Sequence, residues 1–262
     1  MNLKEFADQI ECEFKKEKVQ CEIFVFGNTD STNTRAKEYA KENKSANNVF
    51  FIAQSQSCGR GTRGRSFISD DGGLYISYLL RPSVKADEAI RLTAYSAVAL
   101  LDAILEITGV RCGIKWVNDL FIDGKKVAGI LTEGAFCDGG ECFEYAVVGV
   151  GLNVASVNFC QELSFAATDL ESVTGRRFSV AKIAAALAKR LIRFDGADPL
   201  EYMARYRDHS VVIGKKVLIA SNEGKLLCTV KDICDDGSLV VIDEAGEENR
   251  IVSGDVSLRR LD

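Results

Sequence analysis

The chain has 262 residues, of which 47% are hydrophobic and 27% charged, and its formal net charge is −5. This length predicts one large domain with a smaller one, and the composition predicts a sizeable core with a soluble surface. The mild acidity excludes a protein that binds nucleic acid through overall positive charge. No apolar run approaches the roughly 20 residues of a membrane span, and the N-terminus lacks an apolar signal core, so we expect a cytoplasmic protein.

Nine cysteines and a single histidine, His209, bear on metal binding and redox state. The number of cysteines is odd and no C-x-x-C pair occurs, so a zinc site is not expected. We expect the cysteines to be small, buried apolar side chains in a reducing compartment.

Apolar spacing predicts the elements of the first 209 residues in chain order. Helical periodicity predicts helices over 3–18, from 32 to about 43, over 87–108 and over 179–194. Short apolar runs predict strands at 23–26, 49–54, 74–80, 120–122, 127–131 and 145–150. Asp123-Gly124 separates two of these runs and is typical of a β-hairpin turn.

The pattern changes after residue 210. Short β-rich pieces follow at 211–220, 225–233, 238–243 and 248–252. The turn sequences between them are Asn222-Glu223-Gly224, Asp236-Gly237 and Ala245-Gly246. This pattern predicts a small five-stranded barrel, and hence two domains at 1–209 and 210–262.

A glycine- and arginine-rich loop, CGRGTRGRSF, spans Cys58 to Phe67 and is called the arginine loop below. It spells G-x-G-x-x-G and nearly spells a P-loop, but both motifs require a helix directly afterwards, and residues 66–73 predict none. Its glycines would let the backbone approach an anion, and its arginines offer planar donors for phosphate or carboxylate. Considered alone, the loop is equally consistent with an anion cradle and with a mobile, solvated basic segment.

Three further segments place chemistry-bearing residues on predicted strands. K-W-V-N-D puts Lys115 and Asp119 on one face of a strand pair, within reach of one ligand. K-V-A-G-I-L-T-E carries Gly129 in mid-strand, and V-V-G-V-G-L-N-V carries Gly149 and Gly151 on one strand face. Such glycines would leave a flat slot for a ligand, although ordinary sheet packing also explains each of them.

Together, these segments resemble the biotin protein ligases. The matching order is D-S-T-N, Q-x-x-G-R-G-x-x-G-R, K-W-x-N-D, K-x-A-G-I-L-x-E and G-x-G-x-N, which covers residues 28–155. The resemblance implies an α+β catalytic domain on a mixed sheet with helices, followed by an SH3-like C-terminal barrel. It also implies a two-step reaction. The carboxylate of biotin attacks the α-phosphate of Mg²⁺-ATP to give biotinyl-5′-adenylate, and a lysine of a biotin carboxyl carrier domain then displaces AMP.

The resemblance assigns a role to each site residue. Hydroxyl and amide groups that suit the ureido ring of biotin are those of Ser31, Thr32, Asn33 and Gln56. Arg60, Gly61 and Thr62 would wrap the carboxylate and phosphate, and Lys115 would lie between these two anions. The floor of the biotin slot would be Gly129, Gly149 and Gly151.

On the nucleotide side, the resemblance implies contacts from Arg63, Arg65, Phe67, Asn118 and Asn153, with Phe67 covering adenine. The catalytic set would be Lys115, Arg60 and Asp119. Asp119 would orient the attacking lysine or hold Mg²⁺, and stabilisation of a hairpin is the alternative role for it. The arginine loop would close over the adenylate and exclude water.

Three positions depart from the family pattern. Thr62 stands where an arginine is usual, and the missing charge-assisted bond would cost about 1.5–3 kcal/mol unless Arg63 substitutes. We therefore predict weaker retention of the adenylate. Val117 replaces a proline, and Phe67 replaces a tryptophan while keeping a stacking face.

Two alternatives and several questions stay open. A lipoate ligase or octanoyl transferase could use the same scaffold. A binding module could grip RNA or protein with the barrel, although 211–262 lacks the aromatic residues that base stacking requires. Some relatives carry an N-terminal DNA-binding domain, and we expect no direct DNA binding here because only about 25 residues precede the first motif. The oligomeric state is open, with a homodimer common among relatives, and the acceptor carboxylase is not identified.

Overall fold

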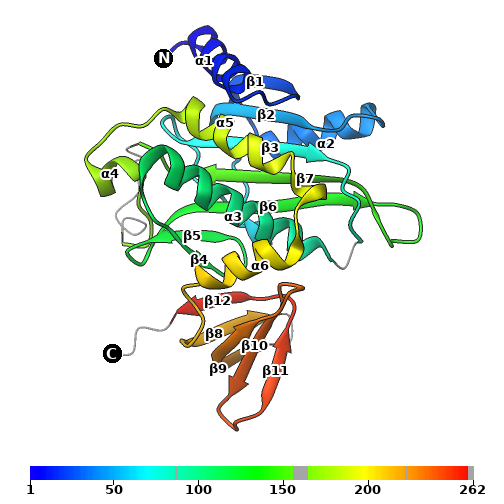
Figure 1. Cartoon of the computed structure of the whole chain (residues 1–262), viewed down its shortest axis with the longest axis vertical. Coiled ribbons are helices and arrows are strands. Elements are labelled where there is room, and N and C mark those ends of the chain that lie inside the picture. Colours follow the sequence, from blue (N-terminus) through cyan, green and yellow to red (C-terminus); the bar gives the residue numbers. More distant parts are fainter. Residues whose placement is uncertain (86–87, 156–164, 222–223, 259–262) are drawn as a thin grey trace.

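The computed structural model describes residues 1–85, 88–155, 165–221 and 224–258. Its larger part is a seven-stranded mixed sheet with helices, and a five-stranded antiparallel sheet forms the C-terminal part (Figure 1). The strand orders are β1-β2-β3-β7-β6-β5-β4 and β11-β10-β9-β8-β12. The predicted α+β class with a mixed sheet is therefore confirmed.

The bounds of the elements follow in chain order. The helices are α1 (Leu3–Lys16), α2 (Thr32–Glu42), the 3₁₀ turn η1 (Thr62–Gly64), α3 (Ala89–Thr108), α4 (Leu170–Thr174), α5 (Val180–Leu191), η3 (Phe194–Gly196) and α6 (Pro199–Asp208). The strands of the larger sheet are β1 (Glu22–Thr29), β2 (Val49–Gln56), β3 (Leu74–Leu80), β4 (Gly113–Lys115), β5 (Asp119–Ile122), β6 (Lys125–Phe136) and β7 (Phe143–Leu152). Those of the smaller sheet are β8 (Lys216–Ser221), β9 (Gly224–Ile233), β10 (Leu239–Asp243), β11 (Glu248–Ile251) and β12 (Asp255–Leu258).

Most predicted elements are present, and the hairpin turn at Asp123-Gly124 has the positive φ angles that such a turn requires. The sequence reasoning missed α4 and α6, and it gave no bounds for β4, the strand that ends at Lys115. Strand β4 has three residues, too few for a periodic signal, whereas α6 has a usable signal in its Asp198 cap and Pro199 at the first turn. Residue 87 of the predicted third helix, the turn residues 222–223 and the terminal residues 259–262 lie outside the described part.

The two faces of the larger sheet are different because strand side chains alternate. Phe50 and Ile52 of β2 belong to a core shared with α1, α3, α5 and α6, whereas Val49 and Phe51 pack with α2. The first core is the larger of the two and contains most of the buried aliphatic residues. The second is small, so much of the α2 face is left to polar and small residues.

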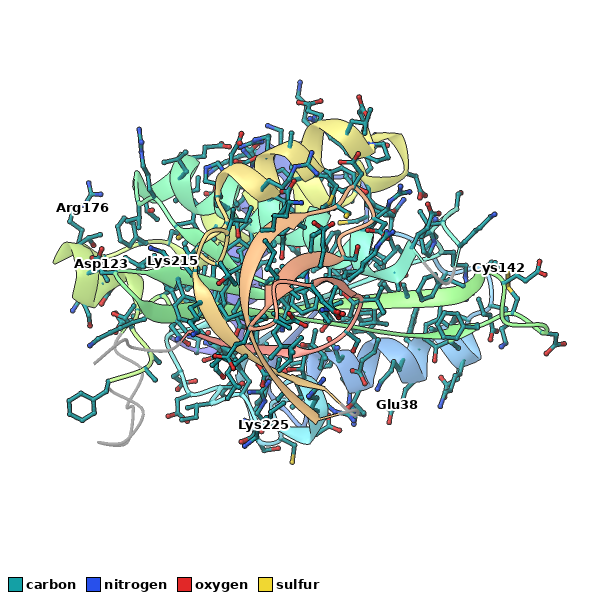
Figure 2. All side chains as sticks on the ribbon, turned by 90° about the horizontal axis from the view of Figure 1, so that it is seen from below. Glu38, Asp123, Cys142, Arg176, Lys215 and Lys225 are labelled. Atoms are coloured by element: carbon teal, nitrogen blue, oxygen red, sulfur yellow. A yellow bond between two sulfur atoms is a disulfide. The ribbon has the colours of Figure 1, made fainter. Side chains whose placement is uncertain are left out.

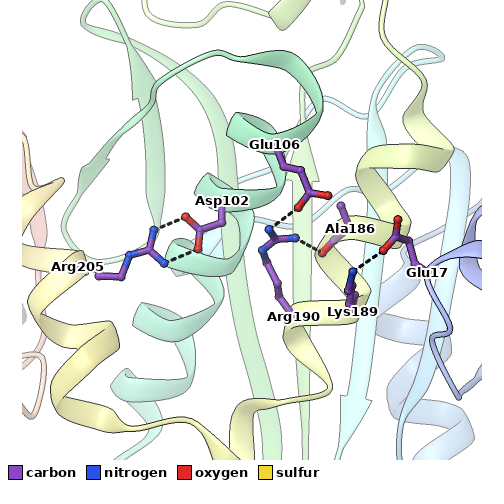
Figure 3. Close-up of polar contacts among 7 residues, drawn as sticks. All are labelled: Glu17, Asp102, Glu106, Ala186, Lys189, Arg190 and Arg205. Carbon is purple, nitrogen blue, oxygen red and sulfur yellow. Dashed lines mark hydrogen bonds and ion pairs between the residues drawn. The ribbon is translucent and has the colours of Figure 1, made fainter.

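Ion pairs connect the helices that pack on the larger core, α1, α3, α5 and α6 (Figure 3). Nη1 and Nη2 of Arg205 on α6 both pair with Asp102 on α3, and Arg190 on α5 donates to Glu106 on α3 at 2.6 Å. Lys189 of α5 also donates to Glu17, just after α1, at 2.7 Å. These pairs are partly exposed, and each contributes at most about 1 kcal/mol, so they fix orientation more than they stabilise.

The smaller sheet rests on the segment that carries Lys115. The backbone N–H of Ile114 donates to the carbonyl of His209 at 2.7 Å, and Val211 donates back to Ile114 at 2.9 Å. The buried indole of Trp116 donates to the carbonyl of Gly237 at 2.8 Å. Contacts therefore cross the predicted division at residue 209, which stays a prediction.

The cysteine prediction needs correction. Cys137 and Cys142 form a disulfide at the tip of the β6–β7 hairpin, and Figure 2 shows Cys142 at an outer end of the molecule. Cys12 and Cys58 are exposed rather than buried. The hairpin brings Cys137 and Cys142 opposite one another, since the N–H of Cys137 donates to the carbonyl of Cys142 at 2.9 Å. Sequence spacing alone did not reveal this pairing.

Candidate active site

The α2 face of the central strands carries the small and polar residues. Val148, Val150 and Leu152 of β7 point into the large core, so Gly149 and Gly151 between them face the other way. The same alternation on β6 turns Gly129, Leu131 and Glu133 to this face. The site therefore lies on the face that α2 partly covers, beside the N-terminal end of that helix.

A cavity of about 130 Å³, called the inner cavity, lies over these residues. It gathers most of the predicted site: Ser31, Thr32, Asn33, Gln56, Arg60, Gly61, Thr62, Arg65, Phe67, Asn118, Gly129, Gly149 and Gly151. The remaining lining residues are Ser66, Lys126, Ile130, Leu131 and Val150. Residues from six separate segments of the chain meet here, so the fold unites motifs that lie far apart in sequence.

Hydrogen bonds lock the polar wall of the inner cavity. The N–H and the hydroxyl of Thr32 donate to Oε1 of Gln56 at 2.8 and 3.1 Å, and the amide of Gln56 donates to Ser69 at 2.9 Å. The buried hydroxyl of Ser77 lies 2.7 Å from Oγ1 of Thr32 and 2.6 Å from Oδ1 of Asn33. The wall is thus pre-organised, and Ser77 is a component that the sequence reasoning missed.

Glu133 is a second residue that the sequence reasoning missed, although it ends the motif K-V-A-G-I-L-T-E. It accepts from the amide of Asn33 at 2.9 Å and from Lys37 at 2.7 Å, and Nη1 of Arg60 lies 3.8 Å away. Burial alone would raise the pKa of Glu133, but the hydrogen bonds from Lys37 and Asn33 overcome it and hold the pKa below its ordinary value. An ionised Glu133 therefore fixes which way the Asn33 amide points.

Gly149 and Gly151 line the cavity, but the space beside them is already used. A Cβ atom on Gly149 would lie 2.1 Å from Oδ1 of Asn33, and one on Gly151 would lie 2.6 Å from the ring of Phe67. The expectation of a bare, flat slot is therefore refined. These two glycines make room for the Asn33 amide and the Phe67 ring, which themselves face the cavity.

The arginine loop folds back on itself rather than leading into a helix. Arg60 and Ser66 form an isolated bridge, and the N–H of Gly61 donates to the carbonyl of Arg65 at 2.7 Å. Only the three-residue turn η1 occurs within it. A dinucleotide or P-loop site, which requires a helix N-terminus here, is therefore excluded by the observed geometry.

A wider cleft of about 480 Å³, called the outer cleft, adjoins the inner cavity and shares Thr62, Arg65 and Asn118 with it. Lys115 lies in the outer cleft, directly opposite Asp119 in the β4–β5 register. Burial lowers the pKa of the Lys115 ammonium group, and the carboxylates of Asp119 and Asp255 oppose this effect. The two carboxylates thus help to keep the lysine charged.

Asp119 is held by a lysine that the sequence reasoning did not assign. Its Oδ1 lies 2.6 Å from Nζ of Lys126, which lines the inner cavity and sits 5.8 Å from the centre of the Phe67 ring. Within the described residues, no group of three or more potential metal ligands occurs. Among these residues, no ligand set therefore supports the predicted metal role of Asp119.

Two predicted nucleotide contacts have structural partners already. The amide of Asn153 donates to the carbonyl of Thr168 at 3.0 Å, and the residue lines neither the inner cavity nor the outer cleft. The amide of Asn118 donates to the carbonyl of Ile130 at 2.8 Å but remains at the cavity wall. Asn118 is thus placed where a nucleotide could reach it, whereas Asn153 holds a loop against β7.

Comparison with known proteins identifies the family. Residues 25–153 match the model of the biotin/lipoate A/B protein ligase family, and residues 212–259 match that of the biotin protein ligase C-terminal domain. The two matched segments together make up more than half of the chain. The chain belongs to the biotin protein ligase family. Among the described helices of this family member, none has the length and apolar character that a membrane span needs.

Individual relatives agree with this family over most of the chain. A bifunctional ligase/repressor of Bacillus spizizenii is 29% identical over 87% of this chain and 71% of its own length. A biotin–[acetyl-CoA-carboxylase] ligase of Mycobacterium tuberculosis is 28% identical over 90% of this chain and 88% of its own length. A biotin protein ligase of Aquifex aeolicus, solved in complex with biotin and ATP, is 28% identical with a TM-score of 0.76, covering 91% of this chain and 99% of that one.

Proposed function

We propose that this protein is an ATP-dependent ligase that forms biotinyl-5′-adenylate and transfers biotin to a lysine of a biotin carboxyl carrier domain. The observation that carries the proposal is the meeting of three features at one place: the polar inner cavity, the arginine loop and Lys115 in the adjoining outer cleft. A solved relative bound to biotin and ATP supports the choice of both small molecules.

The inner cavity suits the ureido ring of biotin. Thr32, Asn33 and Gln56 present hydroxyl and amide groups whose orientations are set by Ser77, Ser69 and Glu133. The ureido group offers two donors and one acceptor, so a fixed set of donors and acceptors recognises it at little entropic cost. The Phe67 ring beside Gly151 offers an apolar surface to the rest of the ligand.

In the first step, an oxygen of the biotin carboxylate attacks the α-phosphorus of ATP, the α–β phosphoanhydride bond breaks, and pyrophosphate leaves with that electron pair. We assign to Lys115 and Arg60 the lowering of repulsion between the two anions that must meet. Arg65 borders both the inner cavity and the outer cleft, so we assign to it the stabilisation of negative charge on the carboxylate and on the phosphate. Mg²⁺ would accompany the nucleotide as its counter-ion.

In the second step, the acceptor ε-amine attacks the acyl carbon, and AMP leaves with the bridging oxygen while the amine loses a proton. Asp119 on β5 could orient that amine. Because Asp119 forms an ion pair with Lys126, we assign this role to the two residues together. We place Lys126 with Lys115 as a second cation near the reacting groups, because it lines the inner cavity.

The carrier domain of a carboxylase is the partner that this reaction requires. We also propose that the protein works in the cytoplasm. The oligomeric state, and the expectation of no direct DNA binding, stay predictions from the sequence. Lipoate or octanoyl transfer on the same scaffold is the second candidate function, because the matched family model includes lipoate ligases.

Mass spectrometry of a purified acceptor domain tests the proposal. After incubation with the protein, biotin and Mg²⁺-ATP, the acceptor should gain the mass of one biotinyl group, and lipoate in place of biotin should give none. Lys115→Ala should abolish the gain while leaving the thermal unfolding temperature close to that of the wild type. A gain with lipoate alone would establish the second candidate instead.

A further inference from the structure

Two side chains of the arginine loop bind a cross-strand pair of the smaller sheet. Nη1 of Arg63 donates to the carbonyl of Ala220 at 2.9 Å, and Nη1 of Arg65 lies 2.9 Å from Oδ2 of Asp255. Ala220 on β8 and Asp255 on β12 are direct partners in the antiparallel register. One pair of neighbouring residues thus receives two side chains of the loop, and in Figure 1 β12 is the strand of the smaller sheet drawn closest to α6.

The backbone of the loop gives a second, independent observation. Arg63 has φ +55° and ψ +39°, a left-handed conformation that is unfavourable for a residue with a Cβ atom. Gly64, which adopts this region freely, follows with φ +73°. In this conformation the Arg63 guanidinium group donates to the carbonyl of Ala220, and this hydrogen bond offsets part of the conformational free energy that the left-handed backbone costs.

The docking position borders the proposed reaction centre. Residues 252–255 form one wall of the outer cleft, and Lys115, Thr62 and Arg65 line the same cleft. The loop residues Gly61, Thr62 and Phe67 also line the inner cavity. A contact that holds the loop on the smaller sheet therefore also holds it over the inner cavity.

We propose that the Ala220–Asp255 pair is a docking site for the arginine loop, and that Asp255 is a positioning residue that keeps the loop closed while the acyl-adenylate is present. The proposal rests on the proposed function. The Arg65 side chain is 59% exposed and that of Asp255 is 32% exposed, so water competes with the pair and the loop can still open. An ion pair of this strength suits a loop that must first exclude water and later open to admit the acceptor lysine. The C-terminal part thereby takes part in the timing of the reaction.

Release of the adenylate tests the positioning role. The adenylate is formed in the protein from labelled biotin and Mg²⁺-ATP and is then chased with unlabelled biotin. Asp255→Asn should release it about 2- to 5-fold faster, the effect that an exposed ion pair supplies. Added salt should accelerate release from the wild type and change the variant less, because the screened pair is absent there. Asp255→Glu should restore most of the retention.

Tryptic cleavage of the ligand-free protein tests the docking without requiring any activity. Cleavage after Arg63 and Arg65, followed by mass spectrometry, should be about 2- to 5-fold faster in Asp255→Asn, because cleavage follows the population of the open loop. Glu248→Gln is the matched control, because it removes an exposed ion pair with Lys231 in the same sheet and Glu248 lines neither the inner cavity nor the outer cleft.

The outcomes separate the two proposals. Equal cleavage rates in the wild type and Asp255→Asn would overturn the docking site. Faster cleavage with unchanged adenylate release would overturn the positioning role. A wild type that forms no adenylate would refute the proposed function, and with it the positioning role, while the cleavage rates would still decide whether the loop docks on Asp255.

Discussion

Substitution of Gly149 by alanine should weaken biotin binding through displacement of Asn33. The new Cβ atom would lie 2.1 Å from Oδ1 and 2.8 Å from Cγ of Asn33, so the amide must move. It cannot move cheaply, because Asn33 is only 4% exposed and donates to Glu133 at 2.9 Å. Loss of that charge-assisted hydrogen bond costs about 1.5–3 kcal/mol. If the biotin contact is lost to the same degree, affinity should fall about 10- to 150-fold.

Calorimetric titration with biotin measures the effect, and thermal unfolding shows whether the variant is folded at the working temperature. Gly196→Ala is the control, because no atom lies within 4 Å of a Cβ placed there. The double variant Gly149→Ala with Asn33→Ala tests the mechanism. Because both changes act on one side chain, the double variant should bind no worse than Asn33→Ala alone. Additive losses, or wild-type affinity in Gly149→Ala, would refute the reasoning.

Four further predictions concern Lys115, Thr62 and Asp30. Lys115→Ala should slow pyrophosphate release by about 100-fold or more, the size of one lost electrostatic donor, and unchanged release would remove Lys115 from the reaction. Burial lowers the pKa of Lys115 below 10.5, so the lysine should lose its charge, and the wild-type rate should decline, below pH 10.5. A rate that does not change up to pH 10.5 would contradict the assignment. Thr62→Arg should slow adenylate release in a stopped-flow chase, and unchanged or faster release would refute the predicted effect of the missing arginine. Hydrogen bonding to Arg35 lowers the pKa of Asp30 from 3.8 to about 2, so the stability it contributes is complete above pH 3.8 and is lost as the pH falls towards 2. Since this pair is over one-third exposed, Asp30→Asn should cost at most about 1 kcal/mol in denaturant unfolding at pH 7, and a difference that is undiminished at pH 2 would count against the pairing.

Local physics decided much of the secondary structure, and the sequence therefore predicted it. The apolar spacing of α1 and the Gly109 stop after α3 are set within a few residues, so both were predicted correctly. The hairpin at Asp123-Gly124 likewise follows from the φ angles that these residue types permit. Sequence reasoning gave no bounds for the three-residue strand β4, which is ordered in part by hydrogen bonds with His209 and Val211, partners distant in sequence.

The sequence by itself determined which residue types could serve an adenylate-forming site, because the arginine loop, K-W-V-N-D and the glycine pairs are local patterns with a chemical meaning. Only the tertiary structure decided how they are connected. It placed Asn33 against Gly149, Lys126 on Asp119 and the loop arginines on β8 and β12. The physical reason is that a side chain chooses its partner by proximity in space. That proximity is created by the packing of the sheet, its helices and the smaller sheet, which residue spacing along the chain does not encode.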